Sequence, residues 1–172
     1  MRKVAVAAFG AALAIAPQAR AMDLTSPDVV PGYSIAQPQL RMDCGGGNVS
    51  PTLVWSGAPA GTKSFAVTVY DPDAQGGWWH WTAYNIPAGT TGLVRGGVLP
   101  AGALAGENDF GDKGYGGPCP PPGSGPHHYQ FTVWAMGTAA LPLEGATQDK
   151  IIGPYIQTHA LASASIVATY ER

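Results

Sequence analysis

Two short segments of this chain gather the side chains that hydrogen-bond anions or move protons. Asp71 and Asp73 stand in D-P-D, and His80 follows them in W-W-H-W. His127 and Tyr129 stand in H-H-Y, in a later and well separated segment of the chain. Each set lies where a strand-like apolar run meets a turn, in a chain with only 4 histidines. The sequence therefore predicts a small polar pocket at the rim of a β structure.

Strand geometry sets the directions of the second group. Side chains two residues apart in an extended chain point to the same face, with their Cα atoms about 6–7 Å apart. His127 and Tyr129 are therefore expected to be a pair of ligand contacts, and His128 is expected to point away from them.

The same alternation places Trp79 and Trp81 on one face and His80 on the other. Either the tryptophans are buried and His80 faces a cavity, or the faces are reversed. If the two strands are neighbours, Asp71 can accept a hydrogen bond from His80 and fix its tautomer. Asp73 either does the same or caps its turn.

Short apolar runs separated by 24 glycines and 16 prolines predict an all-β domain. The expected strands are residues 52–55, 63–71, 79–86, 92–98, 128–136 and 165–170. Residues 147–164 have apolar residues at helical spacing, interrupted by Gly153 and Pro154, which predicts one or two short helices packed outside a sheet. Residues 99–125 form a long glycine- and proline-rich segment of the kind that is usually functional or poorly ordered.

The first 21 residues have the pattern of a secretory signal peptide. Two basic residues precede an apolar stretch over residues 4–15, and Ala19-Arg20-Ala21 fits a small-x-small cleavage site. We expect cleavage after Ala21, a single domain over residues 22–172, and a periplasmic or secreted location. The mature chain then has six basic and eleven acidic residues, a net charge of −5, and no later transmembrane segment. This balance argues against a nucleic-acid partner.

The chain has 2 cysteines, Cys44 and Cys119. An even pair in an exported protein favours a disulfide bond between them. The alternative is two unpaired, buried thiols.

Taken together, these motifs resemble the phosphatidylethanolamine-binding protein family, in its bacterial branch of Raf-kinase-inhibitor-like proteins. The resemblance runs from about residue 43 to the C-terminus, through C-G-G-G-N-V-S-P-T-L-V-W, D-P-D-A, W-x-H, G-P-C-P-P-P-G and H-H-Y-x-F. It implies a Greek-key antiparallel β-sandwich with a small anion pocket at one end and no cofactor. No metal is expected either. Carried over by motif, the ligand-binding residues are Asp71, Asp73, His80, Gly117, Pro118, His127 and Tyr129.

The function expected from these observations is non-catalytic recognition of a phosphorylated or other anionic head group, such as that of a phospholipid. No lysine or arginine stands in these motifs, so the expected donors are an imidazolium of His80 or His127, the Tyr129 hydroxyl, and backbone N–H groups near Gly116 and Gly117. A neighbouring Asp71 would favour the charged imidazolium form.

Three alternatives remain open. The first is a protein-interaction module that inhibits a kinase or protease, with a protein partner or a homodimer. The second is a hydrolase, although no G-x-S-x-G motif is present and Ser124 lies in a glycine loop into which no strand leads. The third is a metal site formed by His80, His127 and the two aspartates.

Overall fold

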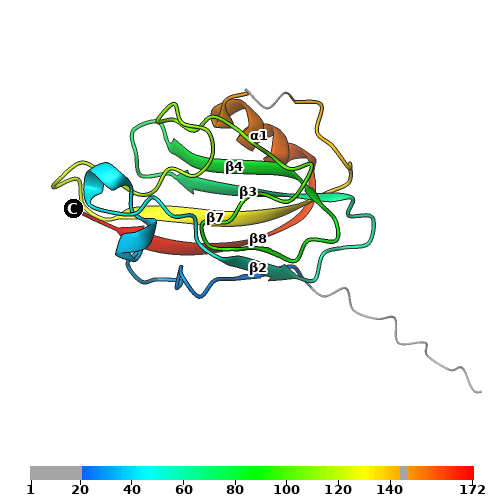
Figure 1. The fold of residues 1–172 in the computed structure, drawn as a ribbon, viewed down its shortest axis with the longest axis horizontal. Coiled ribbons are helices and arrows are strands. Elements are labelled where there is room, and N and C mark those ends of the chain that lie inside the picture. Colours follow the sequence, from blue (N-terminus) through cyan, green and yellow to red (C-terminus); the bar gives the residue numbers. More distant parts are fainter. Residues whose placement is uncertain (1–20, 144–146) are drawn as a thin grey trace, which may run out of the picture.

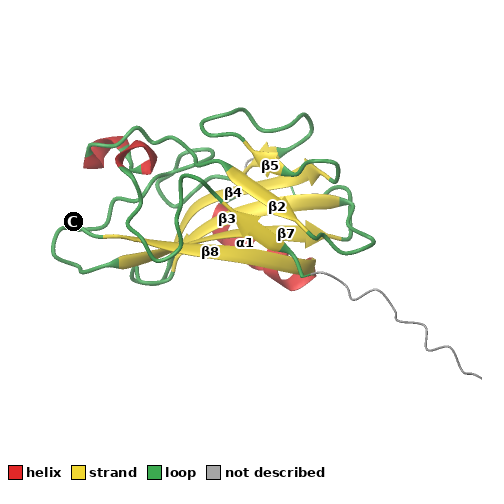
Figure 2. Cartoon of the chain, turned by 90° about the horizontal axis from the view of Figure 1, so that it is seen from below, coloured by secondary structure: helices red, strands yellow, loops and turns green. Residues whose placement is uncertain are grey.

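The computed structural model describes residues 21–143 and 147–172, so the expected signal peptide lies outside the described residues except for Ala21. The described chain forms two antiparallel sheets and one α-helix (Figures 1 and 2). The smaller sheet has the order β1-β2-β5, with bounds Asp23–Thr25, Leu53–Ser56 and Gly92–Leu93. The larger has the order β6-β4-β3-β7-β8, with bounds Leu104–Ala105, Trp78–Pro87, Ser64–Asp71, His127–Met136 and Ala160–Tyr170.

The main core lies between the two sheets. Trp55 of β2 packs against Phe65 of β3 with ring centroids 5.4 Å apart. Apolar residues from both sheets complete this cluster, among them Leu53, Leu93, Val67, Val69, Phe131 and Val133. Burial of apolar area stabilises such a core at about 25 cal/mol per Å².

Helix α1 (Asp149–His159) covers the other face of the large sheet (Figure 1). Its fully buried Ile152 and Ile156 pack against Ala66, Tyr84 and Met136 of the strands beneath. Strand β3 is therefore covered on both faces, so its sequence reads as a nearly continuous buried run. The mainly-β antiparallel sandwich with one helix near the C-terminus confirms the predicted fold class.

Strand β4 carries a bulge at His80. Val69 of β3 pairs with Trp81, while the next residue of β3 already pairs with Trp79. The extra residue turns Trp79 and Trp81 to opposite faces, because a bulge shifts the alternation of side chains. Trp81 enters the core between the sheets, and Trp79 lies beneath Gly153 of α1. The prediction that both tryptophans share one face is wrong for this reason.

The other departures concern the ends of elements. Strand β8 begins at Ala160, so the predicted helical region of residues 147–164 extends too far. Helix α1 is continuous through Pro154. Strand β5 covers only Gly92–Leu93 of the predicted residues 92–98. Two 3-10 turns, Gln37–Gln39 and Met42–Cys44, were not predicted. Within the described ranges, no helix is long and apolar enough to cross a membrane.

Candidate functional site

A cavity of about 560 Å³ opens where β3 ends, β4 bulges and β7 begins. Its size is in the range of small-molecule binding sites. Five of the seven predicted site residues line it: Asp71, Asp73, His80, His127 and Tyr129. The remaining wall consists of Ala74, Gln75, Trp78, Phe110, Cys119, Pro120, Pro121 and Ser124.

Asp71 is a buried residue of the cavity wall that accepts hydrogen bonds from three neighbouring groups. Only 2% of it is exposed. Its Oδ2 accepts a hydrogen bond from Nδ1 of His127 at 2.7 Å, and its Oδ1 accepts bonds from the backbone N–H groups of Asp73 at 2.9 Å and Ala74 at 3.3 Å. These donors satisfy a buried carboxylate and fix the orientation of the His127 ring. The expected bond from His80 to Asp71 is absent, because β3 lies between β4 and β7 and its last residue meets the histidine of β7.

His80 is held by the backbone of the long loop instead. Its Nδ1–H donates to the carbonyl of Gly116 at 2.7 Å, and the N–H of Gly116 donates back to the carbonyl of His80 at 2.8 Å. The ring stands edge-on to Phe110 and Tyr129, with centroid separations of 5.4 Å and 5.1 Å.

The charge state of His80 differs from the sequence expectation. Burial lowers the pKa of His80 to about 4, although the Gly116 carbonyl and the charges of Asp71 and Asp109 act in the opposite direction. The imidazole is therefore neutral at physiological pH. The expectation of an imidazolium at this position is wrong, because desolvation outweighs the neighbouring negative charge.

Tyr129 supplies a hydroxyl donor. Its ring stacks on that of His127 at 6.5 Å, as their two-residue spacing predicted. Burial raises the pKa of Tyr129, and the charge of Asp71 adds to this effect, so the hydroxyl keeps its proton. No described residue forms a hydrogen bond with that hydroxyl, although the side chain lines the cavity.

Asp73 forms part of the rim. Its Oδ2 accepts hydrogen bonds from the backbone N–H of His128 at 2.7 Å and from Nδ1 of the same residue at 2.8 Å. These hydrogen bonds from His128 lower the pKa of Asp73. His128 points away from the cavity, as predicted, and both side chains are substantially exposed. The pair ties the D-P-D turn to the start of β7.

Gly117 and Pro118, the other two predicted ligand contacts, do not line the cavity. The N–H of Gly117 donates to Oδ1 of Asn48 at 2.7 Å, and the carbonyl of Pro118 accepts from the N–H of Arg41 at 3.2 Å. A Cβ atom on Gly117 would lie 2.2 Å from the carbonyl oxygen of Gln39. Glycine is therefore required here for a close approach to another backbone segment, whereas the resemblance implied contact with a ligand.

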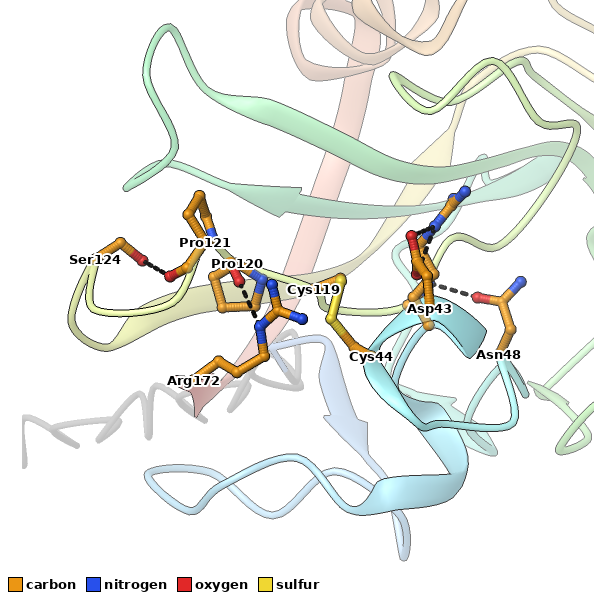
Figure 3. Close-up of a disulfide and its surroundings, with 10 residues drawn as sticks. Asp43, Cys44, Asn48, Cys119, Pro120, Pro121, Ser124 and Arg172 are labelled. Carbon is orange, nitrogen blue, oxygen red and sulfur yellow. Dashed lines mark hydrogen bonds and ion pairs between the residues drawn. A yellow bond between two sulfur atoms is a disulfide. The ribbon is translucent and has the colours of Figure 1, made fainter.

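A disulfide bond joins Cys44 and Cys119, which confirms the predicted pairing (Figure 3). It fixes the wall of the cavity, because Cys119 lines it. Nε of Arg172 also holds this wall, by donating to the carbonyl of Pro120 at 3.2 Å. Asp43 and these two cysteines are the one close group of metal-ligand type among the described residues, and both sulfur atoms are already committed to the disulfide.

Sequence reasoning weighed Ser124 only as a nucleophile and did not place Trp78 or Phe110 in the cavity wall. Oγ of Ser124 lies 3.0 Å from Nε2 of His127 and also donates to the carbonyl of Pro121 at 2.8 Å. The S-x-x-H spacing across a turn is the one sequence signal that could have indicated this contact. Phe110 comes from the middle of the long loop, and the guanidinium of Arg41 lies 3.9 Å from the centre of its ring, on which it stacks.

Comparison with known proteins agrees with this architecture. The family model described as phosphatidylethanolamine-binding protein matches residues 25–171. Protein YbcL of Escherichia coli (strain K12) is 44% identical over 181 residues, covering 99% of each chain. The lipoprotein LppC of Mycobacterium tuberculosis (strain H37Rv) is 39% identical over 157 residues, covering 91% of this chain and 75% of its own.

Solved structures give the same result. The crystal structure of E. coli YbcL superimposes with a TM-score of 0.84 at 45% identity, covering 89% of this chain and 99% of that one. A homologue from Chlamydia trachomatis superimposes with a TM-score of 0.76 at 32% identity, covering 88% of this chain and 98% of that one. The family model, the sequence relatives and the shared fold confirm the predicted resemblance: the chain belongs to the phosphatidylethanolamine-binding protein family.

Proposed function

We propose that this protein binds a phosphorylated or similarly anionic head group, without catalysis, in the cavity formed by Asp71, His80, His127 and Tyr129. The observation that carries the proposal is the Tyr129 hydroxyl, a protonated donor on the cavity wall with no partner among the described residues. Buried polar groups are normally hydrogen-bonded, so a donor left open on a cavity wall suits a ligand acceptor. Membership of a family whose members are generally non-catalytic binding proteins supports the same conclusion.

The Asp71–His127 pair makes the cavity tolerant of negative charge despite its lack of lysine and arginine. Nδ1 of His127 carries a proton because the Asp71 carboxylate accepts from it. Two backbone N–H groups of the D-P-D turn donate to the same carboxylate. These donors of the protein partly offset its negative charge, which reduces its repulsion of a ligand phosphate.

Tyr129→Phe tests the proposal, because it removes one oxygen atom that no described residue uses. Hydrogen bonds to charged groups contribute about 1.5–3 kcal/mol, so the Kd of methyl phosphate measured by titration calorimetry should rise about 10- to 100-fold. The thermal stability should change little. Tyr33→Phe is the matched control, since Tyr33 is 69% exposed and lies outside the cavity wall. Equal affinities of wild type and Tyr129→Phe, or no binding to wild type, would refute the proposal.

Acyl transfer is a second candidate function, favoured by one specific observation. Asp71, His127 and Ser124 form a continuous hydrogen-bonded series, with separations of 2.7 Å and 3.0 Å. This order activates a serine nucleophile when the Ser124 hydroxyl donates to Nε2 of His127 in place of the Pro121 carbonyl. It ranks second because the nearby backbone donors are already used: the N–H of Ser124 donates to Pro121 and that of Gly123 to Arg172. Stabilisation of an oxyanion needs such donors.

A fluorophosphonate probe tests this second candidate. If Ser124 is an activated nucleophile, mass spectrometry will find the label on Ser124 in wild type and not in Asp71→Asn, which keeps the size of the side chain but weakens the base. Ser163, another serine on a surface strand, provides the internal control. Absence of label on Ser124 after prolonged exposure would eliminate acyl transfer.

Export to the periplasm or the medium is part of the proposal. The A-R-A sequence before Met22 and similarity to a lipoprotein support it. The mass of the protein recovered outside the cytoplasm should correspond to a chain that begins at Met22. Inhibition of a kinase or protease, and a homodimer, stay predictions from the resemblance.

A further inference from the structure

His80 offers an acceptor to the cavity. A backbone carbonyl can only accept, so the 2.7 Å contact with Gly116 places the single ring proton of neutral His80 on Nδ1. Nε2 then carries a lone pair. His80 lines the cavity, and no described residue forms a hydrogen bond with this second nitrogen.

The groups around His80 keep it in this form. Asp71 at the end of β3 and Asp109 in the long loop are its acidic neighbours, and His127 and Tyr129 face the same cavity from β7. The ring is 3% exposed, and burial disfavours its charged form. A ligand oxygen that approaches Nε2 must therefore bring its own hydrogen atom, because two lone pairs facing each other repel.

We propose that His80 makes the cavity select the singly protonated form of a phosphomonoester. The P–O–H group donates to Nε2 of His80, while an anionic oxygen of the same phosphate accepts from the Tyr129 hydroxyl. This inference rests on the proposed function and specifies its ligand class. Phosphodiesters and sulfate have the same tetrahedral shape but no ionisable hydrogen to donate near neutral pH, so they leave Nε2 unsatisfied.

Titration calorimetry on the wild-type protein with three probes separates these cases. The probes are methyl phosphate, dimethyl phosphate and inorganic sulfate, each at pH 7.5 and pH 5.0. With a second pKa of about 6, the monoanion of a phosphomonoester rises from about 3% to about 90% of the total over this range. The apparent affinity for methyl phosphate should therefore increase about 30-fold, and that for dimethyl phosphate or sulfate should stay weak at both pH values.

A second ligand shows whether the pH dependence comes from protonation of the ligand or of the protein. Methylphosphonate has a higher second pKa than methyl phosphate, so the midpoint of its pH profile should move upwards if the ligand proton is recognised. A midpoint that is the same for both ligands would assign the titration to the protein and overturn the inference. His159→Ala is the control, because this exposed histidine at the end of α1 lies outside the cavity wall, and it should leave both profiles unchanged.

His80→Phe keeps a ring and removes the acceptor. We expect the preference for methyl phosphate over sulfate to disappear in this variant. If the variant does not fold, the affinities of the wild-type protein for methyl phosphate, dimethyl phosphate and sulfate still test the selectivity. Sulfate binding as tightly as methyl phosphate would overturn the selectivity while leaving the anion site intact, whereas absence of binding by all three probes at both pH values would refute the proposed function itself.

Discussion

Replacing Cys44 and Cys119 together by serine is expected to lower the free energy of unfolding by about 4.5 kcal/mol. The disulfide closes a loop with a sequence separation of 75 residues, and the loss of this constraint lets the unfolded chain explore many more conformations. Denaturant unfolding under oxidising conditions measures the difference between wild type and the double variant.

The reduced wild-type protein is the matched control, because it lacks the bond but keeps both sulfur atoms. It should approach the stability of the double variant. Affinity for methyl phosphate should also fall in both, since Cys119 lines the cavity and the bond fixes that wall to the Met42–Cys44 turn. Unchanged stability in both reduced wild type and variant would show that the hydrogen bonds of Gly117, Pro118 and Pro120 hold the wall alone.

Asp71→Ala is expected to abolish phosphate binding and to lower the free energy of unfolding by about 3 kcal/mol, because removing a buried acceptor leaves its hydrogen-bond donors unsatisfied. The carboxylate accepts bonds from His127 and from two backbone N–H groups of the D-P-D turn. Its removal therefore frees the turn and the imidazole together. Calorimetry and denaturant unfolding measure the two effects.

Asp112→Ala provides the contrast for Asp71→Ala. Asp112 pairs with Arg41 at 3.1 Å, but its side chain is 58% exposed. Exposed pairs contribute between about 0 and 1 kcal/mol, so this variant should retain stability and binding. Similar losses in the two variants would mean that removal of any acidic group, and not of the buried pair, weakens the protein.

The strands and part of the site followed from the sequence because their residues obey local rules. Alternation with a period of two put His127 and Tyr129 on one face and His128 on the other, and the structure has this arrangement. The disulfide followed from an even cysteine count together with a signal-like N-terminus.

The remaining features depend on contacts between distant segments. The bulge at His80 depends on the pairing of β4 with β3, so alternation alone put Trp79 and Trp81 on the same face. His80 finds its hydrogen-bond partner at Gly116, a loop residue 36 positions away, and so does not bond with Asp71.

The position of Ser124 depends on the turn that precedes β7. This turn brings Oγ of Ser124 into contact with Nε2 of His127, although no strand leads into the loop. The small residues at the start of β8 fit a helix or a strand equally well. Pairing with β7 decides between them, and Ala160 onwards becomes a strand.

A crystal structure of the protein soaked with methyl phosphate at pH 5.0 tests the central claim most directly. The expected result is a phosphate in the cavity, with one oxygen at hydrogen-bond distance from the Tyr129 hydroxyl and another at the same distance from Nε2 of His80. The structure also has a second, smaller cavity, whose lining includes Arg41, Asn48 and Asp112. A phosphate bound there, with the larger cavity empty, would contradict the account.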